Sequence, residues 1–278
     1  GDYFQKVPKF GQDRLTAELR YIADRVGNVP DLIFTDANFG MFKQDLETAQ
    51  EIVDIRDNHV KGWPKSILAA TAKNHKERTV EILGMLGDSM QTTAAVQSTD
   101  EEVLSIIRRK NVSLDALVTF AQAAAQHDGQ TEADIILCLE GDSKQAHFKT
   151  IKDMLDAQMT VMCMHQFMML PGTQSSNQVS RKKYELQTRF RVLPRCFGSY
   201  EFRGETFPAA ETEEIVIATT TMPYEDYQVC RDLHLTVEIF HNDSIFLELL
   251  SLLDSQQIDR SEFIFAVHDY LLKGDGLL

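Results

Sequence analysis

The stretch Ala133-Asp134-Ile135-Ile136-Leu137-Cys138-Leu139 decides the fold class of this chain. It is a short apolar run without polar alternation, which is typical of a strand buried on both faces of a parallel sheet. Polar residues 140–143 end the run, and the spacing of residues 144–157 predicts an amphipathic helix. The chain therefore contains at least one unit of strand, turn and helix.

The same unit recurs through the first two-thirds of the chain. Further strands are predicted at residues 31–36, 66–71, 90–96 and 161–169, with helices at residues 44–58, 75–86 and 100–107. Alternating strands and helices imply parallel βα units. This pattern allows a barrel or an open doubly wound sheet, and in both folds ligands bind at the carboxyl ends of the strands.

The alternation stops after Pro171-Gly172. Strand character then occurs at residues 189–193, 200–202 and 214–218, and helical spacing begins at Tyr224. We therefore expect a first domain over residues 1–173. A C-terminal extension, mixed and then helical, is expected over residues 174–278.

Composition and charge narrow the class of partner. Of the 278 residues, 43% are hydrophobic and 25% are charged, as is usual for a globular protein. The net charge of −14 argues against nucleic acid, whose binding relies on clustered lysine and arginine. Because no run of 18 apolar residues and no signal-peptide pattern occurs, we expect no membrane partner and a cytoplasmic location.

The four cysteines are far apart, at Cys138, Cys163, Cys196 and Cys230. Three of them have apolar neighbours, a setting in which a thiol usually acts as a small buried hydrophobe. None has a second cysteine two or three residues away, so their spacing predicts neither a metal site nor a disulfide framework.

Polar residues and glycine follow the predicted strands. Asp36 and Asn38, after the first strand, are suited to bind an amine or hydroxyl, or to form an ordinary turn. Lys73, after the second, could contact a carboxylate or begin a helix. Gln97 ends the third strand and Gly141 follows the fourth. The carboxyl edge of the sheet is thus the candidate site.

A spaced pattern begins at the pair Gln97-Ser98, which ends a strand: Leu104 lies seven and Arg109 twelve positions after Gln97. This pattern resembles one found in radical S-adenosylmethionine (SAM) enzymes. Other stretches resemble motifs of this family in the family's order: residues 3–7, 35–41, 135–143 and 170–173. The resemblance covers about residues 1–172 and is strongest to the subgroup that carries a cobalamin-binding domain. It implies an α/β fold, an incomplete parallel (β/α) barrel followed by a mostly helical C-terminal extension.

The resemblance also implies a role for each candidate residue. Asp36 and Asn38 match the positions that hold the methionine amino group of SAM, and Arg109 the position that pairs with its carboxylate. Gln97 would reach the amino-acid end or the ribose. Lys73 and Gly141 are weaker candidates for binding this cofactor.

The sequence departs from the family in two places. Leu-Glu-Gly-Asp at residues 139–142 replaces the family's Leu-Pro-Gly-Glu. The CxxxCxxC loop, whose thiolates hold a 4Fe–4S cluster, is absent, as is the first barrel strand before it. We therefore expect this chain to be inactive alone, and a cysteine triplet just before Gly1 would assign the parent protein to the enzymes.

The resemblance implies a parent enzyme that cleaves SAM to a 5′-deoxyadenosyl radical and acts on a small molecule of unidentified structure. If a cobalamin domain precedes the barrel, methyl transfer is expected. The alternative is a noncatalytic binding or scaffold protein on the same fold. A metal-independent barrel lyase is a third hypothesis, for which Lys73 is the sole candidate Schiff-base lysine.

Overall fold

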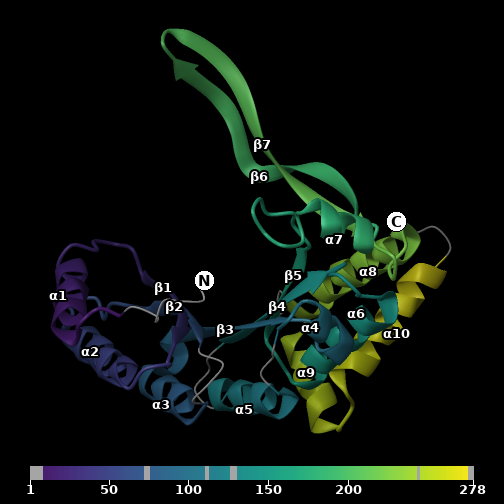
Figure 1. Cartoon of the computed structure of the whole chain (residues 1–278). Coiled ribbons are helices and arrows are strands. Elements are labelled where there is room, and N and C mark those ends of the chain that lie inside the picture. The colour runs from purple at the N-terminus through teal and green to yellow at the C-terminus, as the bar shows by residue number, and fades with distance from the viewer. Residues whose placement is uncertain (1–8, 72–75, 110–112, 126–129, 243–244, 275–278) are drawn as a thin grey trace. The chain divides into compact units, whose positions relative to one another are not determined.

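The computed structural model describes residues 9–71, 76–109, 113–125, 130–242 and 245–274 (Figure 1). The chain divides into two compact units. The first unit comprises Gly1–Ala95, Val112–Glu132 and Gln158–Val161, and the second comprises Val96–Asn111, Ala133–Ala157 and Met162–Leu278. No helix of the described residues has the length and apolarity needed to cross a bilayer.

The first unit is built from βα repeats around one core. Its elements are α1 (Gln12–Ala23), β1 (Asp31–Phe39), α2 (Gln44–Asn58), β2 (Ser66–Thr71), α3 (Lys76–Leu86), η1 (Gly87–Ser89), the greater part of β3 (Met90–Gln97), and α5 (Leu114–Ala125). β1 pairs with β2, and β2 with β3, in parallel. The apolar side of each element is buried in the core, which includes Ile52, Ile67, Ile82, Leu86 and Met90.

The second unit holds the ends of the later strands and the helical C-terminal part. Its elements are α4 (Glu101–Ile106), most of β4 (Gln130–Leu137), α6 (Lys144–Asp156), most of β5 (Val161–Gln166), α7 (Gln178–Lys183), β6 (Gln187–Phe202), β7 (Glu205–Ala218), α8 (Tyr224–Val237), η2 (Glu238–Asn242), α9 (Leu247–Ser255) and α10 (Arg260–Lys273). A buried cluster including Leu137, Val216, Met222 and Cys230 joins the base of β7 to α8.

Five strands follow the order β1-β2-β3-β4-β5, and β6-β7 form a separate sheet. This succession lacks the reversal of strand order that defines a doubly wound sheet. The expected parallel α/β fold with a helical C-terminal part is confirmed, while the domain boundary at residue 173 stays a prediction. Because β3, β4 and β5 begin in the first unit and end in the second, their carboxyl ends lie in the second unit.

The C-terminal part also contains a long antiparallel hairpin, visible in Figure 1 as two strands that run outward from the second unit. It unites the three short stretches that the sequence predicted separately. Its tip is Arg203-Gly204, where both residues have positive φ, at 52° and 81°, as a two-residue type I′ turn requires. The outer strands are exposed, whereas residues 215–218 at the base are buried.

Candidate functional site

Strand β1, in the first unit, contains Asp36 and Asn38. The pairing of β1 with β2 is irregular between Phe34 and Phe39, so both candidates lie within an irregular part of the strand rather than after it. Both are exposed. The Asp36 carboxylate accepts a hydrogen bond from the Asn38 backbone N–H at 2.8 Å, which is the turn geometry that aspartate commonly adopts.

The adjoining turn is fixed by the buried carboxylate of Asp45. Its Oδ2 accepts hydrogen bonds from the backbone N–H groups of Gly40 and Phe42 at 2.8 and 2.9 Å. Burial raises the pKa of Asp45, and these two hydrogen bonds oppose that shift. The turn is therefore held by a carboxylate that sequence analysis did not single out. Lys73 and the motif at residues 3–7 lie outside the described residues.

The β3–α4 turn, in the second unit, begins at Gln97. This residue has a φ of 60°, and its side chain is buried, with 5% of the residue's surface exposed. Its Oε1 is buried and has no hydrogen-bond partner among the described residues. An unpaired buried acceptor is costly, and such atoms are found where a ligand or water completes the bonding. This geometry supports Gln97 as a ligand-binding residue.

The same turn is anchored to α6. The Thr99 backbone N–H donates to Thr150 Oγ1 at 3.0 Å, and the Thr99 hydroxyl donates to Asp153 Oδ2 at 2.5 Å. Asp100 caps α4 by accepting from the backbone N–H groups of Glu102 and Val103, both at 3.0 Å. These bonds leave the backbone around Gln97 little freedom.

Arg109 follows the helix predicted over residues 100–107, which agrees with α4 to within one residue at each end. Helix α4 ends at Ile106, and the Arg108 backbone has a φ of 55°. The N–H of Arg108 donates to the Ser105 carbonyl at 3.2 Å, and that of Arg109 to the Leu104 carbonyl at 2.9 Å. This pair of bonds is a Schellman motif. Both arginines are exposed, so the role of Arg109 stays a prediction.

The β4–α6 turn is the most constrained of the strand-end turns. Cys138 and Gly141 have positive φ, at 69° and 83°. A Cβ atom on Gly141 would lie 2.3 Å from Ile106 Cδ1, so only glycine fits here without movement. The buried Asp142 accepts from the backbone N–H of Cys138 at 3.1 Å and of Ser143 at 2.9 Å. Gly141 thus has a packing role beside any ligand role.

Asp142 stands at one end of a chain of buried polar groups. His147 Nδ1 lies 3.5 Å from Asp142 Oδ2, and His147 Nε2 lies 2.7 Å from His234 Nε2. Arg231 can only donate, so His234 Nδ1, at 3.2 Å from it, accepts. Neutral His234 therefore carries its proton on Nε2 and donates it to His147 Nε2. His147 then carries its own proton on Nδ1, which faces Asp142. Burial is the main cause that lowers the pKa of His234, so the neutral form is favoured.

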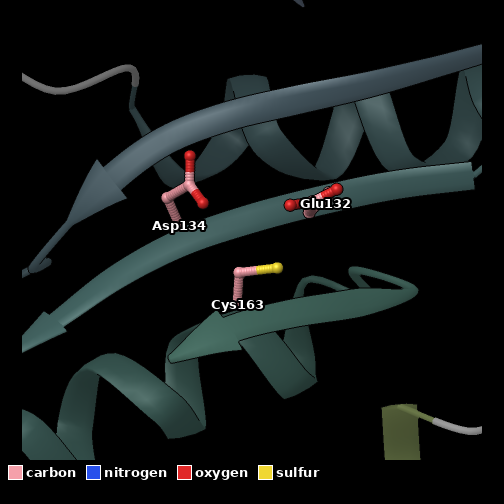
Figure 2. A group of neighbouring side chains, drawn as sticks. All are labelled: Glu132, Asp134 and Cys163. Carbon is pink, nitrogen blue, oxygen red and sulfur yellow. The ribbon is translucent and has the colours of Figure 1, made fainter. Parts of the chain in front are cut away.

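The four cysteines were expected to bind no metal, and this stays a prediction. Cys138 and Cys230 are buried, and burial raises the pKa of both thiols, that of Cys230 to about 12. Without a bound metal, both thiols are therefore protonated at neutral pH. Figure 2 shows Cys163 on β5 beside Glu132 and Asp134 on β4.

Several contributors to the turns were missed by sequence reasoning. Asp142 and Glu140 lie in the Leu-Glu-Gly-Asp stretch, and this departure from the family pattern was the available signal. His147 and His234 are 87 residues apart and carry no motif. Asp36 and Gln97 fall in different units, so the expected convergence of Asp36, Asn38, Gln97 and Arg109 stays a prediction.

No family model matches the chain. Over 237 residues it is 31% identical to 2-(S-pantetheinyl)-carbapenam-3-carboxylate methyltransferase of Streptantibioticus cattleyicolor, covering 84% of this chain and 34% of the relative. Over 268 residues it is 29% identical to the cobalamin-dependent radical SAM methyltransferase TokK of Streptomyces tokunonensis, covering 94% of this chain and 38% of TokK. The chain thus spans little more than a third of each relative.

Among solved structures, the radical SAM methyltransferase TsrM of Kitasatospora setae aligns with a TM-score of 0.48 and 12% identity, over 57% of this chain and 30% of TsrM. The fold and the strand-end turns define a parallel α/β protein with buried polar groups at the carboxyl ends of its strands. The expected resemblance to the radical SAM superfamily is thus confirmed by homology over most of this chain to a radical SAM methyltransferase.

Proposed function

We propose that this chain is the SAM-binding part of a radical SAM enzyme, a cobalamin-dependent methyltransferase that acts on a small molecule. The homology to two methyltransferases, which covers most of the chain, is the observation that carries the proposal. The unpaired Gln97 oxygen at the end of β3 supports it, because it is a buried acceptor at the edge where such folds bind ligands.

In this proposal the described residues bind and orient SAM. Gln97 would accept a hydrogen bond from the amino-acid end or the ribose, and Arg109 would pair with the carboxylate. Asp36 and Asn38 would bind the methionine amino group. When bound next to a reduced cluster, SAM supplies a 5′-deoxyadenosyl radical.

The 4Fe–4S cluster does not fit the cysteines of this chain, so we derive no radical step from them. The second candidate is a noncatalytic binding protein on the same fold. Two observations separate the candidates. A cysteine triplet encoded just before Gly1 supports the enzyme, and so does iron that binds only when that triplet is present.

The binding part of the proposal is tested by calorimetric titration of the chain with SAM. We expect saturable binding, weakened about tenfold or more by Gln97→Ala, because the donor group of the ligand then loses its acceptor. Gln145→Ala, on the exposed side of α6, is the matched control and should bind as the unmodified chain does.

Arg109→Ala should weaken SAM binding more than Arg108→Ala, the neighbouring exposed arginine. Equal, small effects of the two arginine variants would remove Arg109 from the site. A chain that binds no SAM in any form would contradict the proposal as a whole.

A further inference from the structure

Glu140 is a buried acidic side chain that the proposed function leaves unused. It has 7% of its surface exposed, and unlike Asp45 and Asp142 it has a buried carboxylate oxygen, Oε1, without a hydrogen-bond partner among the described residues. Carboxylates are rarely buried without a partner, because removal from water disfavours the charge. Glu140 also stands where the family pattern described above has proline, so the family pattern does not account for it.

The backbone that carries Glu140 is held on both sides. Before it, Cys138 is fixed by its N–H bond to Asp142 Oδ2. After it, Gly141 packs against Ile106, and the Thr221 hydroxyl donates to the Asp142 carbonyl at 2.6 Å. A turn with these restraints does not readily swing its carboxylate out to water, so the unpaired oxygen belongs to the folded arrangement.

A second unpaired acceptor belongs to the neighbouring strand. Gln97 Oε1 follows β3 and Glu140 follows β4, and these strands are adjacent in the sheet. The two turns are packed together, because Gly141 touches Ile106 of the helix that begins after Gln97. Both oxygens lack a donor among the described residues, and a ligand that offers N–H or O–H groups would supply one.

We propose that Glu140 accepts a hydrogen bond from a donor group of the bound nucleoside and sets the specificity of this chain for that group. This inference rests on the proposed function, in which the ligand is SAM. A nucleoside has two sources of such donors, the exocyclic amino group of adenine and the ribose hydroxyls. Both offer the hydrogen that a carboxylate oxygen requires.

The test compares Glu140→Gln and Glu140→Ala with the unmodified chain by calorimetric titration. The probes are SAM, adenosine, inosine, 2′-deoxyadenosine and 3′-deoxyadenosine. We expect both variants to lose at least tenfold in affinity for SAM and for adenosine. If the amino group is the donor, the unmodified chain discriminates against inosine and the variants do not. If a ribose hydroxyl is the donor, the unmodified chain discriminates against 2′-deoxyadenosine or 3′-deoxyadenosine, and the variants do not.

Thermal unfolding separates a binding role from a structural one. Removing a buried carboxylate whose Oε1 has no partner among the described residues should leave the melting temperature of Glu140→Ala unchanged or raise it by a few degrees. Glu185→Gln, an exposed glutamate of the second unit, is the control for general charge effects.

The outcomes distinguish this inference from the proposed function. If the unmodified chain binds SAM and the variants bind all probes equally well, Glu140 is not a ligand residue, although the proposed function stands. A lower melting temperature with unchanged affinity would likewise assign Glu140 to structure alone. If the unmodified chain binds neither SAM nor adenosine, both proposals fail together.

Discussion

The turns after β1 and after β4, one in each unit, both place a glycine of positive φ near a buried aspartate. Gly40 has a φ of 95° and Gly141 a φ of 83°. Asp45 accepts two backbone N–H groups in the first turn, and Asp142 accepts two in the second. The same physical solution therefore occurs twice: a carboxylate gathers backbone donors that a tight turn would otherwise bury unpaired.

The two turns differ in what lies beyond the carboxylate. Around the first turn, Arg78 donates to the carbonyl groups of Gly40 and Met41 at 3.1 and 2.5 Å. Around the second, Asp142 faces the buried His147–His234 pair. The second turn also carries Glu140, whose oxygen is unpaired. The first turn also has a buried oxygen beside it that lacks a hydrogen-bond partner among the described residues, that of the Thr79 hydroxyl. The two turns therefore differ in the kind of unpaired group, which is a hydroxyl beside the first turn and a carboxylate at the second.

The largest effect is expected from filling the glycine of the second turn. Gly141→Ala should lower the free energy of unfolding by about 2–4 kcal/mol, because alanine disfavours positive φ and its Cβ would meet Ile106. Gly40→Ala should cost less, about 1–3 kcal/mol, since its Cβ would meet Thr79 Oγ1 at 2.9 Å rather than a carbon at 2.3 Å. Denaturant titration measures both.

Ile106→Val in the Gly141→Ala background tests the cause, because it removes the Cδ1 atom that the new Cβ would meet. It should restore part of the lost stability. A double variant no more stable than Gly141→Ala would show that backbone conformation alone sets the cost.

A smaller effect is expected from pH. The lowered pKa of His234 means that the unfolded chain takes up its proton first, so stability due to His234 is present above pH 6.5 and is lost as pH falls. Its slope cannot exceed about 1.4 kcal/mol per pH unit. His234→Gln should therefore flatten the decline in unfolding free energy between pH 7 and pH 5.

Asp45 supplies a contrast of opposite sign. The raised pKa of Asp45 means that the folded chain holds this proton more tightly than the unfolded chain does. The contribution of Asp45 to the free energy of unfolding is therefore present below pH 3.8 and is lost as pH rises. Asp45→Asn should remove that dependence and leave the decline between pH 7 and pH 5 in place. A decline that His234→Gln does not alter would show that other groups govern acid stability.

The smallest effect concerns the helix that packs under the second turn. Arg108→Gly should raise the free energy of unfolding by about 0.5–1 kcal/mol, because glycine accepts the φ of 55° at this helix end without strain. Arg109, one residue later, does not have a positive φ, so Arg109→Gly should not raise the free energy of unfolding. If both substitutions destabilise the chain equally in chemical denaturation, the Schellman motif does not govern this end.

The βα repeat could be predicted from the sequence, because buried strands and amphipathic helices leave local patterns. The range 44–58 for the helix and 66–71 for the strand agree with α2 and β2. Helices α1 and α5 were not identified. The hairpin was divided into pieces because its outer residues face solvent on both sides and lack the alternation that burial imposes.

The candidate site, like the fold, was predictable from the sequence only where its residues follow local patterns. The sequence by itself indicated the resemblance to the superfamily and marked Gln97 as a candidate, because motif spacing and strand ends are local properties. Only the tertiary structure brought His147 to His234 and left the Oε1 atoms of Gln97 and Glu140 buried with no partner among the described residues. Burial and pairing of polar groups depend on segments far apart in the chain, so no local pattern records them.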